Sequence, residues 1–356
     1  MRKGERLGLV IGLAVVGLGV GTAMVWQIQN AEPPLPPRAT KAALPELGVY
    51  EQSGVWTQSG RYVYPEANKT LNFTAEDHSY FTFGGRALMQ ETRYTAENGE
   101  DNELAVRGWN EATEKHSYLL VTDTGRIVTF EGDWSAMDRT MQWEITHPAT
   151  NSLKMSVEFQ EIIPAPNRKR LNWEWRTFAT VLKEVRVDCT RQGDRAGPSP
   201  SEFGKPAQEE LKLLGEAGTW TERQFYGEGG EGMRMKGRAR WAAGGNCLVY
   251  EGVVTSGDSE GTPVLWIKTY DSEVKVYRYA YFGANGGVDH YVGRWDPDNN
   301  KMVWRCRKLN SAASPDMSSV IEETFTMSGH KAWTFKVREF GKIVIEGRGD
   351  SLRVDE

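Results

Sequence analysis

The sequence predicts an all-β protein in which two tandem antiparallel up-and-down β-barrels follow an N-terminal transmembrane helix. Three observations favour this. The chain contains one stretch twice, its aromatic-rich strand runs recur at about ten-residue spacing with glycine-containing turns between them, and it opens with a long uncharged run. A chain of 356 residues also exceeds one ordinary core and suits two domains.

The uncharged run lies in the first segment, residues 1–26. Basic residues within 1–6 precede Leu7–Trp26, which carries no charge. About 20 apolar residues suffice to cross a bilayer, and the basic flank stays in the cytoplasm. We therefore expect a single-pass membrane anchor with the barrels outside the cytoplasm. A long signal peptide cut after Ala23 or Ala31 is the alternative, which would make the protein periplasmic or secreted.

The composition divides the rest of the chain into a stalk, two barrels and a linker. Residues 27–46 are rich in proline, which favours extended polyproline geometry and predicts a stalk. Barrel one is expected over 47–190 and barrel two over 208–356. Residues 191–207 are rich in Gly, Pro and Ser, so this linker should leave the geometry between the barrels adjustable.

The duplicated stretch runs from Leu104 to Trp143 and again, without a gap, from Leu265 to Trp304. The identical pairs include Leu104/Leu265, Tyr118/Tyr279, Gly125/Gly286, Gly132/Gly293, Trp134/Trp295, Met141/Met302 and Trp143/Trp304. The chemical type of the side chain is the same at Arg107/Lys268, Val106/Ile267, Trp109/Tyr270 and Asn110/Asp271. One fold unit is therefore written twice.

Both copies open with a short helical segment followed by Gly-x-Trp, as Gly54-Val55-Trp56 and Gly218-Thr219-Trp220. This resembles the opening of calycin-type β-barrels, the lipocalin and fatty-acid-binding class. The resemblance implies that the Trp plugs the closed end of each barrel.

The wider order of motifs resembles the bacterial family called domain of unknown function 1579, whose members look calycin-like. Copy one carries the pattern as Gly84-Gly85-Arg86, Glu91, Gly108-Trp109-Asn110, Asp123 and Gly125. Copy two departs from it at Asn246, Thr269 and Ala284. The resemblance covers nearly all of both domains. It implies a fold and little function, and it implies that copy two has lost part of any polar site that includes Arg86 and Asp123.

One strand face of copy two is a candidate ligand surface. Tyr277, Tyr279 and Tyr281 occupy alternate positions of a predicted strand, so their side chains lie on the same face of it. In copy one, Tyr118 occupies the position that aligns with Tyr279. Facing inward, their rings and hydroxyls would line a small-molecule cavity. Facing outward, they would cover a packing surface between the domains.

Two carboxylates occupy matching positions in the copies, Glu91 and Glu251, each on the strand after a Gly-Gly bend. A buried carboxylate needs a partner, so each is interpreted as a ligand anchor, a structural salt bridge or a rim residue. The candidate ligand-binding residues are Arg86, Glu91, Tyr118, Asp123, Glu251, Tyr277, Tyr279 and Tyr281.

Other kinds of site receive little support. The net charge of −5 with interspersed signs disfavours nucleic acid. None of the five histidines aligns with a histidine of the other copy, so no metal, haem or other cofactor is expected. No catalytic motif is present, and an enzyme is the weakest reading. A Cys247–Cys306 disulfide that leaves Cys189 unpaired is an open alternative.

Two functions remain. The first is a membrane-tethered protein that binds a small, mostly apolar ligand in one or both barrels. The second is a non-catalytic module with filled barrels whose outer faces dock another protein of the cell envelope.

Overall fold

The computed structural model describes residues 39, 41–50, 53–96, 99–147, 155–177, 180–193, 204–215, 217–227, 231–310, 316–327 and 329–354. The predicted anchor, most of the stalk and residues 194–203 of the linker lie outside these ranges. Within them, no helix is long and apolar enough to span a membrane.

Barrel one starts with the 3-10 helix η1 (Pro45–Tyr50) and contains a second one, η2 (Phe83–Gly85). Its ten strands are β1 (Gly54–Tyr64), β2 (Lys69–Thr82), β3 (Ala87–Ala96), β4 (Gly99–Asn110), β5 (Lys115–Val121), β6 (Ile127–Ser135), β7 (Thr140–His147), β8 (Met155–Ala165), β9 (Arg168–Thr177) and β10 (Thr180–Gly193).

Barrel two repeats this plan, with η3 (Glu210–Leu214) before its first strand and η4 (Ala243–Gly245) before its third. Its ten strands are β11 (Gly218–Tyr226), β12 (Glu231–Ala242), β13 (Cys247–Ser256), β14 (Pro263–Asp271), β15 (Val276–Phe282), β16 (Val288–Asp296), β17 (Lys301–Cys306), β18 (Met317–Met327), β19 (His330–Glu339) and β20 (Lys342–Val354).

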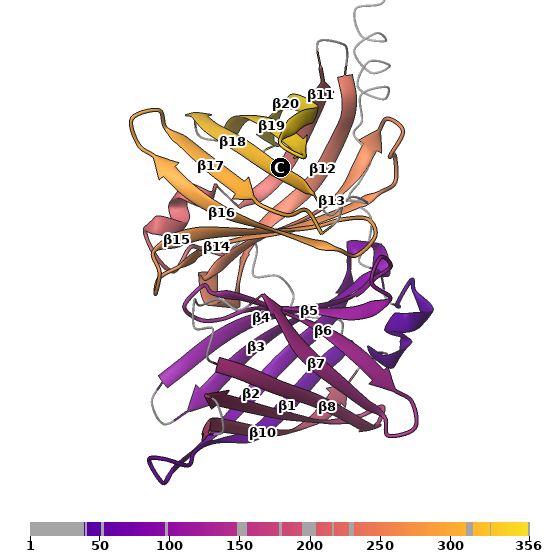
Figure 1. Cartoon of the computed structure of the whole chain (residues 1–356), viewed down its shortest axis with the longest axis vertical. Helices are drawn as coiled ribbons and strands as arrows, with labels where there is room; N and C mark the ends of the chain where they lie inside the picture. The colour runs from indigo at the N-terminus through magenta and orange to yellow at the C-terminus, as the bar shows by residue number, and fades with distance from the viewer. Residues whose placement is uncertain are drawn as a thin grey trace, which may run out of the picture. The chain divides into compact units, whose positions relative to one another are not determined.

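Each barrel is an up-and-down sheet closed on itself (Figure 1). Strands adjacent in sequence pair antiparallel, and closure comes from β1 on β10 and from β11 on β20. Closure leaves no sheet edge exposed. The all-β, tandem-barrel prediction is thus confirmed for the described chain, while the transmembrane helix stays a prediction.

The first 3-10 helix of each barrel packs into the inner cluster together with the Trp of Gly-x-Trp. Leu47 and Tyr50 of η1 are buried with Trp56 in the inner cluster of barrel one. In barrel two, Leu211 and Leu214 of η3 join Trp220 in the same way.

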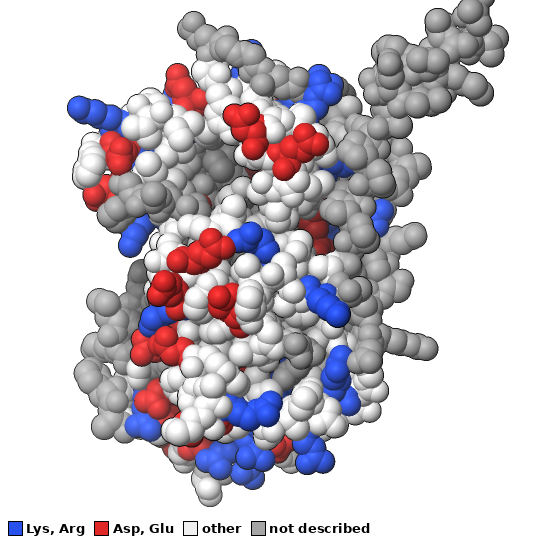
Figure 2. Space-filling view, turned by 90° about the vertical axis from the view of Figure 1, so that its right-hand side faces the viewer, with Lys and Arg blue, Asp and Glu red and all other residues white. Residues whose placement is uncertain are grey.

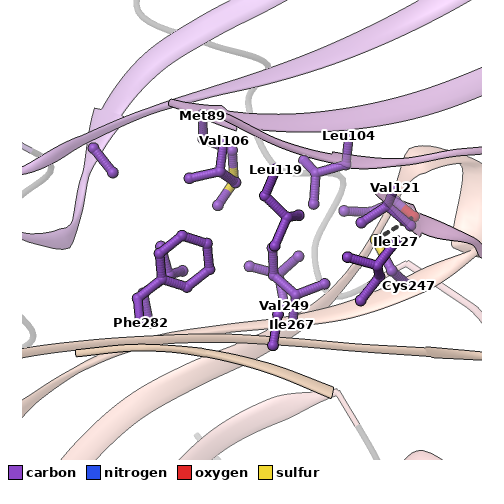
Figure 3. Close-up of a cluster of buried hydrophobic side chains, with 14 of the residues drawn as sticks. Met89, Leu104, Val106, Leu119, Val121, Ile127, Cys247, Val249, Ile267 and Phe282 are labelled. Atoms are coloured by element: carbon purple, nitrogen blue, oxygen red, sulfur yellow. Dashed lines mark hydrogen bonds between the residues drawn. The ribbon is translucent and has the colours of Figure 1, made fainter. Parts of the chain in front are cut away.

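The two barrels share a buried apolar interface built from the outer faces of β3–β6 and β13–β16. Figure 3 shows side chains from the two sheets pointing toward one another. Aligned positions meet there, because the cluster contains Met89 and Val249, Leu104 and Leu265, Val106 and Ile267, Leu119 and Ala280, Val121 and Phe282, and Ile127 and Val288. This contact is that of a pseudo-twofold dimer within one chain. It replaces the adjustable arrangement expected from the linker.

Backbone hydrogen bonds repeat the pseudo-symmetry. The amide of Glu111 donates to the carbonyl of Asn285 at 2.8 Å, and the amide of Ser272, which aligns with Glu111, donates to Thr124, which aligns with Asn285, at 3.0 Å. The same backbone hydrogen bond therefore occurs twice across the interface, once with the donor in each copy.

Gly125 and Gly286 explain why the duplication keeps two turn glycines. Their φ values are +77° and +80°, which disfavour any residue with a Cβ. A Cβ at Gly125 would also collide with the carbonyl oxygen of Tyr270, and one at Gly286 with that of Trp109. These glycines let each copy's turn lie against the other copy's strand.

The three cysteines are free and buried, so the Cys247–Cys306 disulfide is wrong. Cys247 lies in the interface between the barrels, whereas Cys306 lies in the inner cluster of barrel two. Side chains on opposite faces of one barrel wall cannot be joined.

Candidate functional site

The four predicted tyrosines point into the barrels. Tyr118 lies in the inner cluster of barrel one, with its ring 5.3 Å from that of Trp143 and 5.5 Å from that of Phe159. Tyr277 and Tyr279 are buried in the inner cluster of barrel two, and Tyr281 packs against it. Burial raises the pKa of Tyr281 to about 12, so its hydroxyl stays protonated. Of the two orientations that the sequence left open, the structure has the inward one. Ligand binding by these side chains stays a prediction.

Glu91 and Glu251 lie between the barrels. Both face Arg240 of β12, whose Nη2 is 2.6 Å from Glu91 Oε1 and whose Nε is 3.9 Å from Glu251 Oε2. Arg240 also donates to the Tyr80 hydroxyl, and Thr82 donates to Glu251. This arrangement matches the salt-bridge interpretation, because one buried cation holds both carboxylates.

Arg86 and Asp123 do not join these groups. Arg86 pairs with Glu111 beside η2. Asp123 is exposed in the turn after β5. The eight predicted residues therefore lie in five places, namely the two barrel interiors, the interface, the end of η2 and the turn after β5.

A buried polar network fills the middle of barrel one. Arg107 Nε lies 3.5 Å from Glu161 Oε2, and Arg107 Nη1 donates to Gln90 Oε1 at 2.5 Å. Gln90 Nε2 donates to Asp77 Oδ2 at 2.7 Å, and Lys169 Nζ lies 3.7 Å from the same oxygen. Two cations and two carboxylates thus form one chain away from water.

Barrel two holds a more compact version. Glu323 accepts from Lys268 Nζ at 2.7 Å through both oxygens, and Lys331 Nζ lies 3.5 Å from its Oε1. Trp304 Nε1 donates to Oε2 at 2.8 Å. Burial acts to raise the pKa of Glu323, but the two lysines outweigh it and lower that pKa to about 2. Burial lowers the pKa of Lys268 to about 8, although Glu323 opposes the shift.

The carboxylate and the second cation of these networks are not among the residues predicted from the sequence. Glu161 aligns with Glu323 and Lys169 with Lys331 once the duplication is extended past Trp143 with a one-residue gap. The pair Arg107/Lys268 was recognised as chemically equivalent. A buried cation predicts a buried carboxylate nearby, and that search would have found the partners.

The end of barrel one that carries the β1–β2 and β9–β10 turns has an aromatic cage around a lysine, and we call this end the mouth of barrel one. Lys183 Nζ lies 4.3 Å from the ring centre of Tyr62, 5.0 Å from that of Trp175 and 5.9 Å from that of Tyr64. Strand β10 carries Lys183 directly opposite Trp175 of β9. Lys183 has no ion pair with any described residue, and burial lowers its pKa.

Three carboxylates, Glu103, Asp101 and Asp123, act electrostatically on Lys183 without forming an ion pair with it. Glu103 accepts a hydrogen bond from the Tyr94 hydroxyl at 2.8 Å. Burial raises the pKa of Glu103 to about 7, with Asp123 and Asp101 adding to the shift and the Tyr94 bond opposing it. Asp123, predicted from the family resemblance, therefore belongs electrostatically to this mouth.

The same end of barrel two has lost these groups. Lys183 aligns with Ile345, Trp175 with Val337, Glu103 with Val264 and Asp123 with Ala284. The hairpin between β19 and β20 instead exposes Phe340, Ile343, Val344 and Ile345.

No group of three or more His, Cys, Asp or Glu side chains suited to a metal ion occurs in the described ranges. Acidic and basic side chains are interspersed on the molecular face in Figure 2, and this face carries no extended basic surface.

No protein-family model matches the chain, and no curated protein matches it in sequence. A solved protein of unknown function from the DUF3598 family of Nostoc punctiforme PCC 73102 shares 11% identity, over 86% of this chain and 97% of its own, at a TM-score of 0.28. The S-type phycobiliprotein lyase CPES of Guillardia theta shares 10% identity, over 42% of this chain and 92% of its own, at a TM-score of 0.25.

A putative AttH of Nitrosomonas europaea shares 9% identity, over 90% of this chain and 99% of its own, at a TM-score of 0.18. At these TM-scores the likenesses carry no argument about function. Membership of the domain of unknown function 1579 family stays a prediction.

Proposed function

We propose that the protein is a membrane-tethered, extracytoplasmic binding protein whose barrel one holds a small, mostly apolar ligand with one anionic group at its mouth. The observation that carries this proposal is Lys183, a half-buried cation that lies among three aromatic rings without an ion pair. The rings offer apolar surface to the body of a ligand, and the ammonium offers a charge-assisted hydrogen bond to its anionic end.

Buried groups in the same barrel add support. The Tyr50 hydroxyl, the Gln58 amide and Trp143 Nε1 are buried without a hydrogen-bond partner among the described residues. In barrel two, Trp304, which aligns with Trp143, donates to Glu323. Barrel one therefore retains polar groups that its own side chains do not satisfy, and such groups favour a polar guest.

Calorimetric titration of the full chain with dodecanoate tests the proposal, with dodecanol as the uncharged probe. Dodecanoate should bind more tightly than dodecanol, and Lys183→Met should abolish that difference. Lys336→Met, which removes an exposed lysine of barrel two, should leave both affinities unchanged. Equal affinity of wild type and Lys183→Met for dodecanoate would refute the role of the mouth.

A second function, docking of another envelope protein, is favoured by the exposed hairpin of barrel two. Phe340 is 75% exposed, and Ile343, Val344 and Ile345 are each more than 40% exposed. Exposed apolar clusters of this kind often mark interaction sites. A photo-crosslinking residue at position 340, used in the native host, should capture one reproducible partner that Ile343→Ser with Ile345→Ser releases. Crosslinking that the serine substitutions do not change would exclude this function.

A further inference from the structure

A cleft of about 1180 Å³ lies between the barrels and is lined by residues of both. Its walls come from β5 and β6 of barrel one and from β15–β17 of barrel two. Leu119, Ile127 and Val288 of the buried interface reach its floor. The cleft is therefore built by the contact between the two copies and is absent from either one alone.

The barrel-two wall of this cleft is basic. Arg294 and Arg305 project from the outer face of β16 and β17, and Arg307 and Lys308 follow at the end of β17. None of these four cations forms an ion pair with a described residue. The carboxylates that line the cleft are Glu131 and Asp296.

The register brings the arginines close together. Val292 pairs with Arg305 and Arg294 pairs with Val303, so the two arginines are diagonal neighbours on adjacent strands. Like charges at such positions repel one another. These four cations gather on one face of a chain whose net charge is −5.

The other copy shows that the fold does not require these cations. Arg294 aligns with Asp133 and Arg305 with Glu144, and Thr146 stands where copy two has Arg307. Copy one thus has acidic or neutral side chains on the equivalent face. The charge reversal belongs to copy two and to the cleft that this face lines.

We propose that the cleft between the barrels binds a phosphate group of an anionic ligand. Guanidinium groups match phosphate oxygens through paired hydrogen bonds. Arg294 and Arg305 would supply these donors, Arg307 and Lys308 would add charge, and the hydroxyls of Ser117 and Thr129 on the opposite wall would complete the site. The ligand is either a free phosphate compound or a lipid headgroup, which share this chemistry.

Calorimetric titration of the full chain with three soluble probes separates these sources. Pyrophosphate represents a free phosphate compound, dihexanoyl phosphatidic acid represents an anionic headgroup, and dihexanoyl phosphatidylcholine has no net charge. Binding of pyrophosphate indicates a free phosphate ligand, and binding of phosphatidic acid alone indicates a lipid.

The decisive variant combines Arg294→Asp with Arg305→Glu, the residues that copy one carries at these positions. It should weaken binding of the preferred probe at least about tenfold, because two charge-assisted contacts are lost. The neutral pair Arg294→Gln with Arg305→Gln should also weaken it, which keeps the test valid if charge reversal disturbs folding.

The matched control is Arg223→Asp with Arg348→Glu, two exposed arginines elsewhere on barrel two, which should leave affinity unchanged. Failure of both anionic probes to bind wild type, or equal affinity in the glutamine variant, would overturn the proposal. Since this test does not involve Lys183, its failure leaves the proposed function untouched.

Discussion

Barrel one and barrel two place charges at the same three interior positions, yet they pair these charges differently. In barrel two, Glu323 binds Lys268, Lys331 and Trp304. In barrel one, Glu161 lies 3.5 Å from Arg107, which relies on Gln90 for a closer contact.

The difference extends to the residues around these networks. Asp77 aligns with Gly237, and Gln90 aligns with Tyr250. The ring of Tyr250 lies over Gly237 and stacks on the ring of Trp266, with 4.9 Å between the ring centres. Barrel two thereby replaces polar links with a packed ring, and its mouth has become apolar. Barrel two thus pairs its buried charges within its own core, whereas barrel one leaves the Tyr50 hydroxyl and Trp143 Nε1 without a hydrogen-bond partner among the described residues.

The largest expected effect is a loss of stability when the buried carboxylate is removed, and this loss should differ between the two networks. Glu323→Gln should lower the free energy of unfolding by about 3–5 kcal/mol, because it removes the carboxylate that pairs with two buried lysines. Glu161→Gln should cost only about 1–3 kcal/mol, because Arg107 retains Gln90. Urea unfolding of both variants measures this. Equal losses of unfolding free energy in the two variants would contradict the expected difference between the two networks.

The interface should show the next largest effect, and it should be asymmetric. Arg240→Met should lower the free energy of unfolding by about 2–4 kcal/mol, because it removes the buried guanidinium that faces the half-buried carboxylates Glu91 and Glu251. Tyr80→Phe, at the aligned position of copy one, should cost about 1 kcal/mol, because it removes the hydroxyl that accepts from Arg240 and donates to the Met89 sulfur. Arg223→Met serves as an exposed control that should be neutral. An Arg240→Met variant as stable as this control would show that the ion pairs do not hold the barrels together.

Glu103 should give barrel one a pH dependence that barrel two lacks at the aligned Val264. The folded chain keeps this proton up to about pH 7, as the raised pKa of Glu103 indicates, whereas an unfolded glutamic acid loses it near about pH 4.3. The contribution to stability is thus complete below the lower value and is lost as the pH rises through the higher one.

Glu103→Gln should remove that slope, which amounts to about 1 kcal/mol after allowance for partial exposure. Unfolding midpoints at pH 5 and pH 8 measure it. A slope that persists in the variant would assign the pH dependence to another group.

The smallest expected effect on stability belongs to Lys183. Lys183→Met should change the free energy of unfolding by less than about 1 kcal/mol, because no ion pair is lost and the methionine retains contact with the rings. The same variant should lose binding of an anionic probe. A large loss of stability would mean that this lysine supports the fold.

Much of the fold could be predicted from the sequence, because turn glycines and alternating aromatic residues are local signals that the duplication repeats. Strand alternation placed Tyr277 and Tyr279 on one strand face, which the structure bears out, but it left open whether that face points into the barrel. The interface could not be foreseen in the same way. Met89 and Leu104 alternate like core residues, and their sequence does not say which barrel face a second barrel covers.

The candidate site was harder to predict for a related reason. Lys183 lies opposite Trp175 across a pair of strands whose register contains a bulge. Tyr62 comes close to Lys183 only because the closing strand β1 pairs with β10. Asp123 was identified through a family resemblance, and only the folded chain places it near Glu103 and Lys183. Non-local pairing of this kind leaves no periodic trace in a single sequence.

Native mass spectrometry of the full chain, purified from its own host without denaturation, tests the central claim most directly. The account predicts a reproducible extra mass on wild type that organic solvent removes, and its absence from Lys183→Met. The variant Lys336→Met should retain that mass. A bare polypeptide mass for wild type, or an extra mass that Lys183→Met retains, would contradict a ligand site at the mouth of barrel one.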